Sequence, residues 1–147
     1  IRVTGGPCSY NVWFKTGQNN ETFFATNSYN HLIGIRTDSK LQMTRTYNGS
    51  WISTNPITSY LNNQWHMLTM TYDGSTITAY IDGALIDNKT GNYSWMSSEY
   101  TSSTYFGANI NSSSTNKLYF NGKMDNIRTY NRALTQAEIT NLFNAKQ

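Results

Sequence analysis

The chain has a single cysteine, few charged residues and no long apolar run. Cys8 alone cannot form a disulfide within the chain, so a hydrophobic core has to hold the fold together. Charged residues make up only 13% of the sequence, and Lys and Arg are scattered without the clustered stripe that nucleic-acid binding uses. No apolar run approaches the length of a membrane span, and no signal-peptide pattern opens the chain. We therefore expect no nucleic-acid partner and no membrane insertion.

Aromatic, hydroxyl and amide side chains are abundant instead. Aromatic residues make up 14% of the chain, led by 11 Tyr, and Ser, Thr and Asn are frequent throughout. This composition is typical of a β-rich protein that presents hydroxyls, amides and rings at its surface. The length of 147 residues fits one domain with a real core. We expect a single domain over residues 1–147 that belongs to, or was excised from, a longer protein, because the chain begins abruptly at Ile1 and heads directly into a strand.

The stretch from Trp65 to Gly83 predicts the central hairpin of the fold. Apolar and polar residues alternate in two runs, and Asp73-Gly74 between the runs supplies the positive φ of a tight turn. Asp82-Gly83 then turns the chain again. The alternation predicts that one face of this hairpin is buried in an antiparallel sandwich and that the other is exposed to solvent. The residues expected on the buried face are Leu68, Met70, Tyr72, Ile77, Ala79 and Ile81.

Short apolar runs separated by turn signals predict further strands, and Asn48-Gly49 is the best hairpin signal among these turns. Residues 88–103 lack a clean period and contain several aromatics, so we expect an irregular but ordered functional segment there. Many short strands indicate an all-β sandwich or barrel. The expected strands cover residues 10–16, 22–26, 31–37, 41–47, 50–54, 104–108, 118–120 and 122–130. Further core residues are expected at Trp13, Phe14, Phe24, Ile35, Trp65, Ile127 and Leu142.

One helix is predicted at the end of the chain. Thr135 and Glu138 have the spacing of a capping box, and Leu134 and Ile139 have the spacing of a hydrophobic staple. Beyond the cap, the helix has one narrow apolar stripe. We expect the helix to lie across the outside of a sheet. The stripe consists of Ile139, Leu142 and Phe143.

The acidic residues do not form the pattern of a glycoside hydrolase. Retaining hydrolysis needs two carboxyl groups about 5–5.5 Å apart, yet no two acids here lie at i and i+2 on an expected strand. His31 and His66 have no nucleophile pattern beside them. We therefore expect no enzymatic activity, and the remaining route to catalysis is an acid pair brought together in space. The acids are Glu21, Asp38, Asp73, Asp82, Asp87, Glu99, Asp125 and Glu138.

Three blocks of the sequence resemble the laminin-G-like branch of the concanavalin A-like lectin/glucanase superfamily. They are Trp13–Thr16, the Trp65–Gly83 hairpin with its Tyr-Asp-Gly and Tyr-x-Asp-Gly motifs, and Gly122–Thr135 running into Glu138-Ile139. The resemblance implies an all-β jelly-roll β-sandwich of two antiparallel sheets with one short C-terminal α-helix. Such a sandwich limits the number of exposed sheet edges.

The resemblance also implies a candidate calcium site. Many members of the superfamily bind Ca²⁺ at the rim of the sandwich, and Asp125 falls at a position that resembles one ligand. The family usually has two adjacent acids there, whereas this chain has Asp125-Asn126. Ca²⁺ takes six to eight oxygens, and amide or backbone carbonyls can replace carboxylates. The alternative is that Asp125 accepts hydrogen bonds from backbone amides at a bend of the strand.

Aromatic residues near turns and in the irregular segment are the candidate ligand-binding residues. Flat rings beside amides and hydroxyls suit the C–H faces and hydroxyl groups of sugars. The alternative is that most of these rings are buried in the sandwich or in a contact between subunits. The candidates are Tyr47, Trp51, Tyr93, Trp95 and Tyr100.

The functional hypothesis is a non-catalytic carbohydrate-binding or adhesion module. Its expected partner is a glycan or surface polysaccharide, and other protein subunits of a larger assembly are a second class of partner. We expect an extracellular, cell-surface or virion-surface location. The alternatives are a structural or assembly domain of a virion, fibre or surface layer, and a degenerate glycanase.

Overall fold

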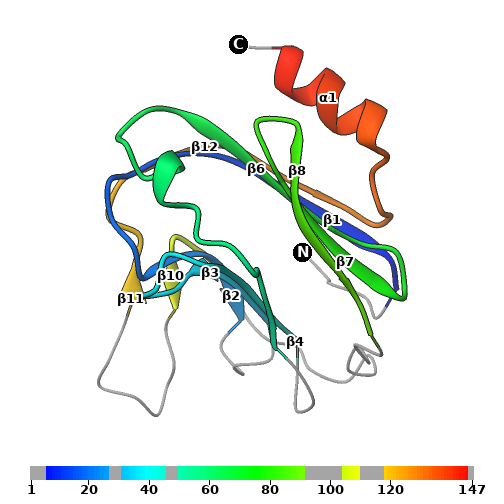
Figure 1. Ribbon diagram of the computed structural model, residues 1–147, viewed down its shortest axis with the longest axis horizontal. Helices are drawn as coiled ribbons and strands as arrows, with labels where there is room; N and C mark the ends of the chain where they lie inside the picture. Colours follow the sequence, from blue (N-terminus) through cyan, green and yellow to red (C-terminus); the bar gives the residue numbers. More distant parts are fainter. Residues whose placement is uncertain (1–5, 27–30, 46–49, 92–103, 110–117, 146–147) are drawn as a thin grey trace.

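The computed structural model describes residues 6–26, 31–45, 50–91, 104–109 and 118–145. These residues form two five-stranded antiparallel sheets that face each other, and one helix covers the outer side of one sheet (Figure 1). A short two-stranded sheet and one turn of 3-10 helix complete the described chain. The predicted all-β sandwich with a C-terminal helix is confirmed.

The first sheet, sheet A, has the strand order β12-β1-β6-β7-β8, so the central hairpin β6–β7 lies inside it. Strand β1 pairs with β6 on one side and with β12, from the far end of the chain, on the other. Only the tertiary fold brings these segments together, and the site described below depends on that pairing. The strands are β1 Cys8–Lys15, β6 His66–Tyr72, β7 Thr76–Ile81, β8 Ala84–Thr90 and β12 Lys123–Tyr130.

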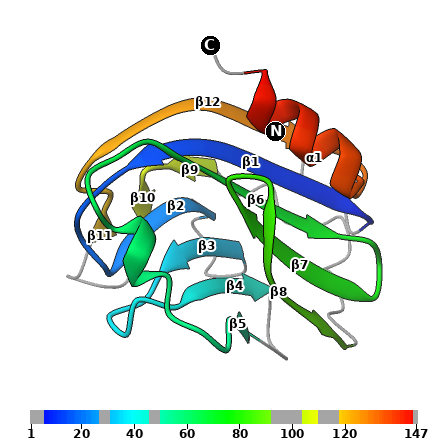
Figure 2. The same cartoon turned by 45° about the horizontal axis from the view of Figure 1, so that its top comes forward.

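The second sheet, sheet B, has the order β5-β4-β3-β2-β9 and lies beneath the curve of sheet A (Figure 2). The pair β10–β11 forms a separate small sheet, and the helix η1 lies between β5 and β6 in the chain. The elements are β2 Glu21–Thr26, β3 His31–Ile35, β4 Leu41–Arg45, β5 Ser50–Ile52, η1 Thr58–Tyr60, β9 Thr104–Phe106, β10 Ala108–Asn109 and β11 Leu118–Tyr119.

Both turns of the central hairpin form as predicted. In the first, Gly74 has φ 109°, and Oδ1 of Asp73 accepts hydrogen bonds from the backbone N–H groups of Ser75 and Thr76 at 2.8 Å. In the second, Asp82 and Gly83 have φ 53° and 79°, the left-handed conformations that a tight hairpin turn requires. This turn leads directly into β8. Residues 88–90 belong to β8, so the prediction of an irregular segment from residue 88 was wrong at its start.

The main core lies between the two sheets. Nine of the predicted core residues are buried here, and a phenylalanine ring pair, Phe14 with Phe23, packs edge-on at 5.1 Å between centroids. Cys8 is buried in the same core. The confirmed residues are Phe14, Phe24, Ile35, Leu68, Met70, Tyr72, Ile77, Ala79 and Ile81.

The outer face of β6 is buried as well, contrary to the prediction of a solvent-exposed face. Met67 and Thr69 are both 0% exposed, because helix α1 (Gln136–Asn144) and the segment before it cover this face of sheet A. Met67 packs with Ile139 of the helix in a second apolar cluster. The amide of Asn11 donates a hydrogen bond to Oγ1 of Thr69 at 2.7 Å within this layer.

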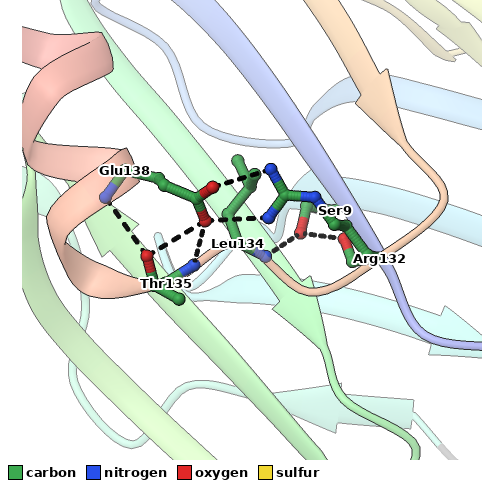
Figure 3. Close-up of polar contacts among 5 residues, drawn as sticks. All are labelled: Ser9, Arg132, Leu134, Thr135 and Glu138. Carbon is green, nitrogen blue, oxygen red and sulfur yellow. Dashed lines mark hydrogen bonds and ion pairs between the residues drawn. The ribbon is translucent and has the colours of Figure 1, made fainter.

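Helix α1 begins with the predicted capping box (Figure 3). The hydroxyl of Thr135 accepts from the backbone N–H of Glu138 at 3.3 Å, and the Glu138 carboxylate accepts from the backbone N–H of Thr135 at 2.8 Å. Leu134 and Ile139 are both buried in the second cluster, as the staple predicts. The start of the helix is therefore determined by contacts within six consecutive residues.

The capping box is tied to the strands through Arg132 and Ser9 (Figure 3). Arg132 donates two hydrogen bonds to the Glu138 carboxylate, at 2.7 and 2.8 Å. These bonds, together with the hydrogen bonds from Thr135, lower the pKa of Glu138 to about 2. The hydroxyl of Ser9 in β1 donates to the backbone carbonyl of Arg132 and accepts from the backbone N–H of Leu134. These contacts fix the helix over sheet A.

Four of the predicted core residues are not fully buried. Trp65 is 42% exposed and Ile127 is 40% exposed, so both predictions were wrong. Trp65 lies just before β6 begins, and Ile127 lies on β12, an edge strand of sheet A that pairs on one side only among the described strands. Trp13 and Leu142 are half-buried against the second cluster.

Candidate functional site

A cleft of about 480 Å³ lies on the outer face of sheet A, beside the C-terminal half of α1. Its volume is in the range of small-molecule binding sites. Two tryptophans, one phenylalanine, two carboxylates, an amide and a guanidinium line it, and we call it the aromatic cleft. Its residues are Trp13, Trp65, Asp82, Asp125, Asn126, Arg128, Leu142, Phe143 and Ala145.

Strand pairing brings two of these residues together. Trp13 of β1 and Asp125 of β12 are direct cross-strand partners, and cross-strand partners share one face of a sheet. Phe14, the next residue of β1, is 0% exposed in the core between the sheets. Alternation therefore directs Trp13 to the outer face, where the helix lies. Asp82 enters the cleft from the turn between β7 and β8.

A β-bulge in β12 shapes the polar side of the cleft. The register between β1 and β12 shifts between Asn11 and Trp13, and Asn126 has φ 49° at this point. A bulge inserts an extra residue and re-aims the side chains around it. As a result Asp125 and Arg128, which flank the bulge, both line the cleft. Within the described chain they form no ion pair with each other at 4 Å or less.

The apolar side of the cleft combines a fixed ring pair with an exposed ring. Trp13 stacks on Phe143 of α1, with ring centroids 5.8 Å apart and an interplanar angle of 16°. This stack holds the end of the helix against β1. Trp65 is 42% exposed and therefore offers ring surface to a ligand.

The two carboxylates of the cleft differ in their contacts. Asp82 is engaged on both oxygens: Oδ2 lies 2.7 Å from Nδ1 of His66, and Oδ1 accepts from the backbone N–H of Met67 at 2.9 Å. Asp125 uses Oδ1 to accept from the backbone N–H of Asn126 at 2.7 Å. Asp82 is thus a structural group that holds its turn against β6. In Asp125, by contrast, Oδ2 accepts no hydrogen bond from the described residues.

Several polar groups of the cleft have no hydrogen-bond partner among the described residues. They are Oδ2 of Asp125, the guanidinium of Arg128 and the indole N–H groups of Trp13 and Trp65. A cleft lined by one free carboxylate oxygen, one free guanidinium and two indole donors can bind a ligand that both donates and accepts hydrogen bonds.

The carboxyl group of Glu21 lies outside the cleft. It is 4% exposed, and its Oε2 accepts a hydrogen bond from the backbone N–H of Asn121 at 2.6 Å. Burial raises the pKa of Glu21, and the hydrogen bond from Asn121 offsets part of this effect. A raised pKa is what a general acid of glycoside hydrolysis needs, but Glu21 does not line the aromatic cleft.

The ligand-binding residues predicted from the sequence fall largely outside the described ranges. Tyr47, Tyr93, Trp95 and Tyr100 lie in undescribed segments. The backbone of Trp51 is in β5 and pairs with Met43 of β4, but its side chain is not described. These residues stay a prediction.

Sequence analysis missed Trp13, Trp65 and Arg128 as site residues. Two signals could have found the tryptophans. Trp13 alternates with Phe14 on a strand, which places it on the opposite face from the core. Trp65 follows the Asn62-Asn63 turn and precedes the first strand of the hairpin, so it occupies the end of an element rather than its centre.

Asp125, the predicted calcium ligand, lines the aromatic cleft. Among the described residues no three His, Cys, Asp or Glu side chains lie close enough together to hold a metal ion. Asp82, the other carboxylate of the cleft, already uses both oxygens. The described side chains therefore supply few of the six to eight oxygens that Ca²⁺ takes. The contact of Asp125 with the N–H of Asn126 is the kind that the alternative interpretation describes.

Comparison with known families identifies the class of the protein. A laminin-G-type family model, described as the concanavalin A-like lectin/glucanases superfamily, matches residues 1–140. The chain therefore belongs to this superfamily. No curated protein sequence matches the chain. No helix among the described residues has the length and apolar character needed to cross a membrane.

Solved structures with the same fold include several binding domains. Domain 4 of AbnA, a GH43 extracellular arabinanase from Geobacillus stearothermophilus, was solved in complex with arabinotriose. It has a TM-score of 0.72 and 22% identity, over 95% of this chain and 68% of that one. A Bacteroides ovatus protein with a proposed carbohydrate-binding function has a TM-score of 0.76 and 16% identity, over 95% and 41%.

The binding domain of botulinum neurotoxin DC, solved in complex with SialylT, has a TM-score of 0.69 and 17% identity, over 97% of this chain and 36% of that one. The chain thus spans less than half of the Bacteroides and neurotoxin chains. At these identities the likeness concerns the fold.

Proposed function

We propose that this domain is a non-catalytic carbohydrate-binding module and that the aromatic cleft is its binding site. The observation that carries the proposal is the combination, in one cavity, of an exposed ring, Trp65, with polar groups on Asp125 and Arg128 that have no hydrogen-bond partner among the described residues. A sugar ring has apolar C–H faces that pack on indole and hydroxyl groups that need donors and acceptors.

Solved structures with the same fold support the same class of function. One of them was solved with a bound arabinotriose and another with SialylT. An extracellular or cell-surface location, where glycans are displayed, follows from the proposed partner. A virion surface is a further location of the same kind.

A glycan array tests the function, and substitutions of tryptophan locate the site. We expect the parent to bind one class of glycan and Trp65→Ala to weaken this binding by about 1–2 kcal/mol, or roughly five- to thirtyfold. Because the Trp65 side chain is 42% exposed, the melting temperature of the Trp65→Ala protein should differ little from that of the parent. Tyr119→Ala is the matched control, since Tyr119 is 59% exposed and does not line the cleft. Absence of glycan binding by the parent would overturn the proposal.

The loop aromatics are the second candidate location within the same function. Trp51→Ala and Trp95→Ala test whether at least one of these rings stacks on a glycan. If either substitution abolishes binding while Trp65→Ala does not, the module binds glycans at its loops. If Trp65→Ala alone weakens binding, the aromatic cleft is the site.

A glycanase is favoured by one observation, the presence of Asp82 and Asp125 in one cleft. Against it, both oxygens of Asp82 are held by His66 and by the backbone N–H of Met67, so this carboxylate is not available to a substrate. Release of reducing ends from a bound glycan measures hydrolysis directly. Release that is lost in Asp125→Asn would establish catalysis and overturn the non-catalytic part of the proposal.

An assembly role is favoured by exposed apolar residues near the edges of the two sheets. Phe106 is 37% exposed and Ile127 is 40% exposed, and both line one small apolar cavity. Such residues suit contact with another protein subunit. A solution mass measurement distinguishes an assembly domain from a carbohydrate-binding module, because a stable oligomer without glycan binding would favour assembly.

Calcium at Asp125 remains part of the proposal as an accessory ligand. Neighbouring backbone carbonyl and amide oxygens would have to complete its coordination. The test is calorimetric titration of the parent and of Asp125→Asn with CaCl₂. Heat of binding in the parent that disappears in the variant would support the site, and equal traces from both proteins would exclude Asp125 as a ligand.

A further inference from the structure

We propose that the aromatic cleft selects a neutral sugar, which bridges Asp125 and Arg128 with two adjacent hydroxyl groups while its C–H face packs on Trp65. This inference rests on the proposed function and adds the chemical class of the ligand. It follows from the polar groups of the cleft that lack a partner among the residues the structure describes, and from the balance of charge around them.

The first argument is complementarity. An ionised carboxylate only accepts hydrogen bonds and a guanidinium only donates them, whereas a hydroxyl group does both. Asp125 and Arg128 flank the bulge of β12, both line the cleft, and they are not paired with each other. A pair of adjacent hydroxyls can donate to Oδ2 of Asp125 and accept from Arg128 at the same time. A ligand group that only accepts hydrogen bonds can bind Arg128 but not the carboxylate of Asp125, and a group that only donates them can bind Asp125 but not Arg128.

The second argument is charge. Asp82 and Asp125 bring two carboxylates into the cleft, and Arg128 brings one guanidinium. His66 contacts Asp82 from the side of β6 but does not line the cleft. A uronic or sialic acid would therefore approach two like charges for one opposite charge, and like-charge juxtaposition selects against a partner. A neutral sugar meets no such repulsion.

The third argument is the apolar surface that lines the same cleft as the charged groups. Leu142 and Phe143 of α1 line the cleft together with Trp65. A sugar packed there loses water from its C–H face, and the hydrogen bonds at Asp125 and Arg128 then form in a partly desolvated environment where they are stronger. The hydrogen bonds with Asp125 and Arg128 set the orientation of the sugar ring. The apolar residues provide the contact area for its C–H face.

The test uses the glycans that bind on the array, including neutral oligosaccharides and their uronic-acid and sialylated counterparts, and compares the parent with Asp125→Asn. Asn keeps an oxygen for the backbone N–H of Asn126 but loses the negative charge. For a neutral sugar the substitution should weaken binding roughly ten- to a hundredfold, because a hydrogen bond to a charged acceptor is lost. For an acidic sugar it should strengthen binding, because repulsion is removed. The sign of the change therefore identifies the class of ligand.

Two further measurements complete the experiment. Arg128→Gln should also weaken binding of a neutral sugar, and the parent's affinity should be nearly independent of salt because the ligand carries no charge. Asp38→Asn is the matched control: Asp38 lies in the turn between β3 and β4, is 44% exposed at its side chain and does not line the cleft. Melting temperatures of all variants check that they are folded.

The outcomes separate this inference from the proposed function. Binding of neutral glycans that falls in Asp125→Asn, Arg128→Gln and Trp65→Ala supports both. Binding of glycans that these substitutions do not weaken, or binding restricted to acidic or amino sugars, overturns the inference and leaves the proposed function standing. Absence of any glycan binding overturns both.

Discussion

Truncation of Leu68 tests the register of the central hairpin. Leu68 is 2% exposed and lies between Val12 of β1 and Ile81 of β7, which are 7% and 0% exposed. Leu68→Ala removes three carbon atoms, which corresponds to roughly 2.4 kcal/mol of lost transfer free energy at about 0.8 kcal/mol per methylene. The neighbouring strands are held by ladder hydrogen bonds and cannot close the gap, so the cavity adds to this loss. We expect a total loss of about 3–5 kcal/mol.

The matched control is the same substitution at Leu85 on β8, an edge strand of the same sheet. Leu85 is 53% exposed, so truncation there should cost less than about 1 kcal/mol. Urea unfolding followed by circular dichroism gives both values, provided that the slope with denaturant stays constant. A loss below about 1 kcal/mol at Leu68, or equal losses at the two positions, would mean that the assigned face of β6 is wrong.

Three further predictions concern the helix cap and the buried carboxyl. Thr135→Ala should destabilise the domain by about 1 kcal/mol and speed amide exchange in residues 136–139, whereas unchanged exchange would show that the capping box does not hold the helix. The parent should lose stability as pH falls from 4.5 to about 2, where Glu138 gains its proton, and this part of the loss should be absent in Glu138→Gln. Burial raises the pKa of Glu21, so its charged form opposes folding; Glu21→Gln should be at least as stable as the parent at pH 7, and a clear loss there would contradict this reasoning.

Contacts between near neighbours in the chain were predictable from the sequence. The Asp73-Gly74 turn depends on hydrogen bonds that Asp73 accepts from the next residues, and the cap of α1 depends on Thr135 and Glu138. Alternation in β6 and β7 correctly grouped the residues that share a face. These features depend on backbone geometry over a few residues, which composition and spacing specify directly.

Whether another layer of the structure buries a given face of a sheet was not predictable in the same way. Thr69 is polar and was expected to face solvent, yet it is 0% exposed on the face of β6 where Met67 packs against α1, whereas Ile127 is apolar and 40% exposed on β12, the last strand of the sheet. Alternation shows which residues point in the same direction. It contains no information on whether a second layer lies over them.

The sequence by itself determined the sandwich class, the hairpin, both of its turns and the start of the helix. Only the tertiary structure decided the candidate site, because its parts come from opposite ends of the chain. Trp13 meets Asp125 through the pairing of β1 with β12, and Phe143 reaches Trp13 because the helix docks on that face. Long-range strand pairing is set by the burial of the whole core rather than by any local pattern, and so the aromatic cleft exists only in the folded chain.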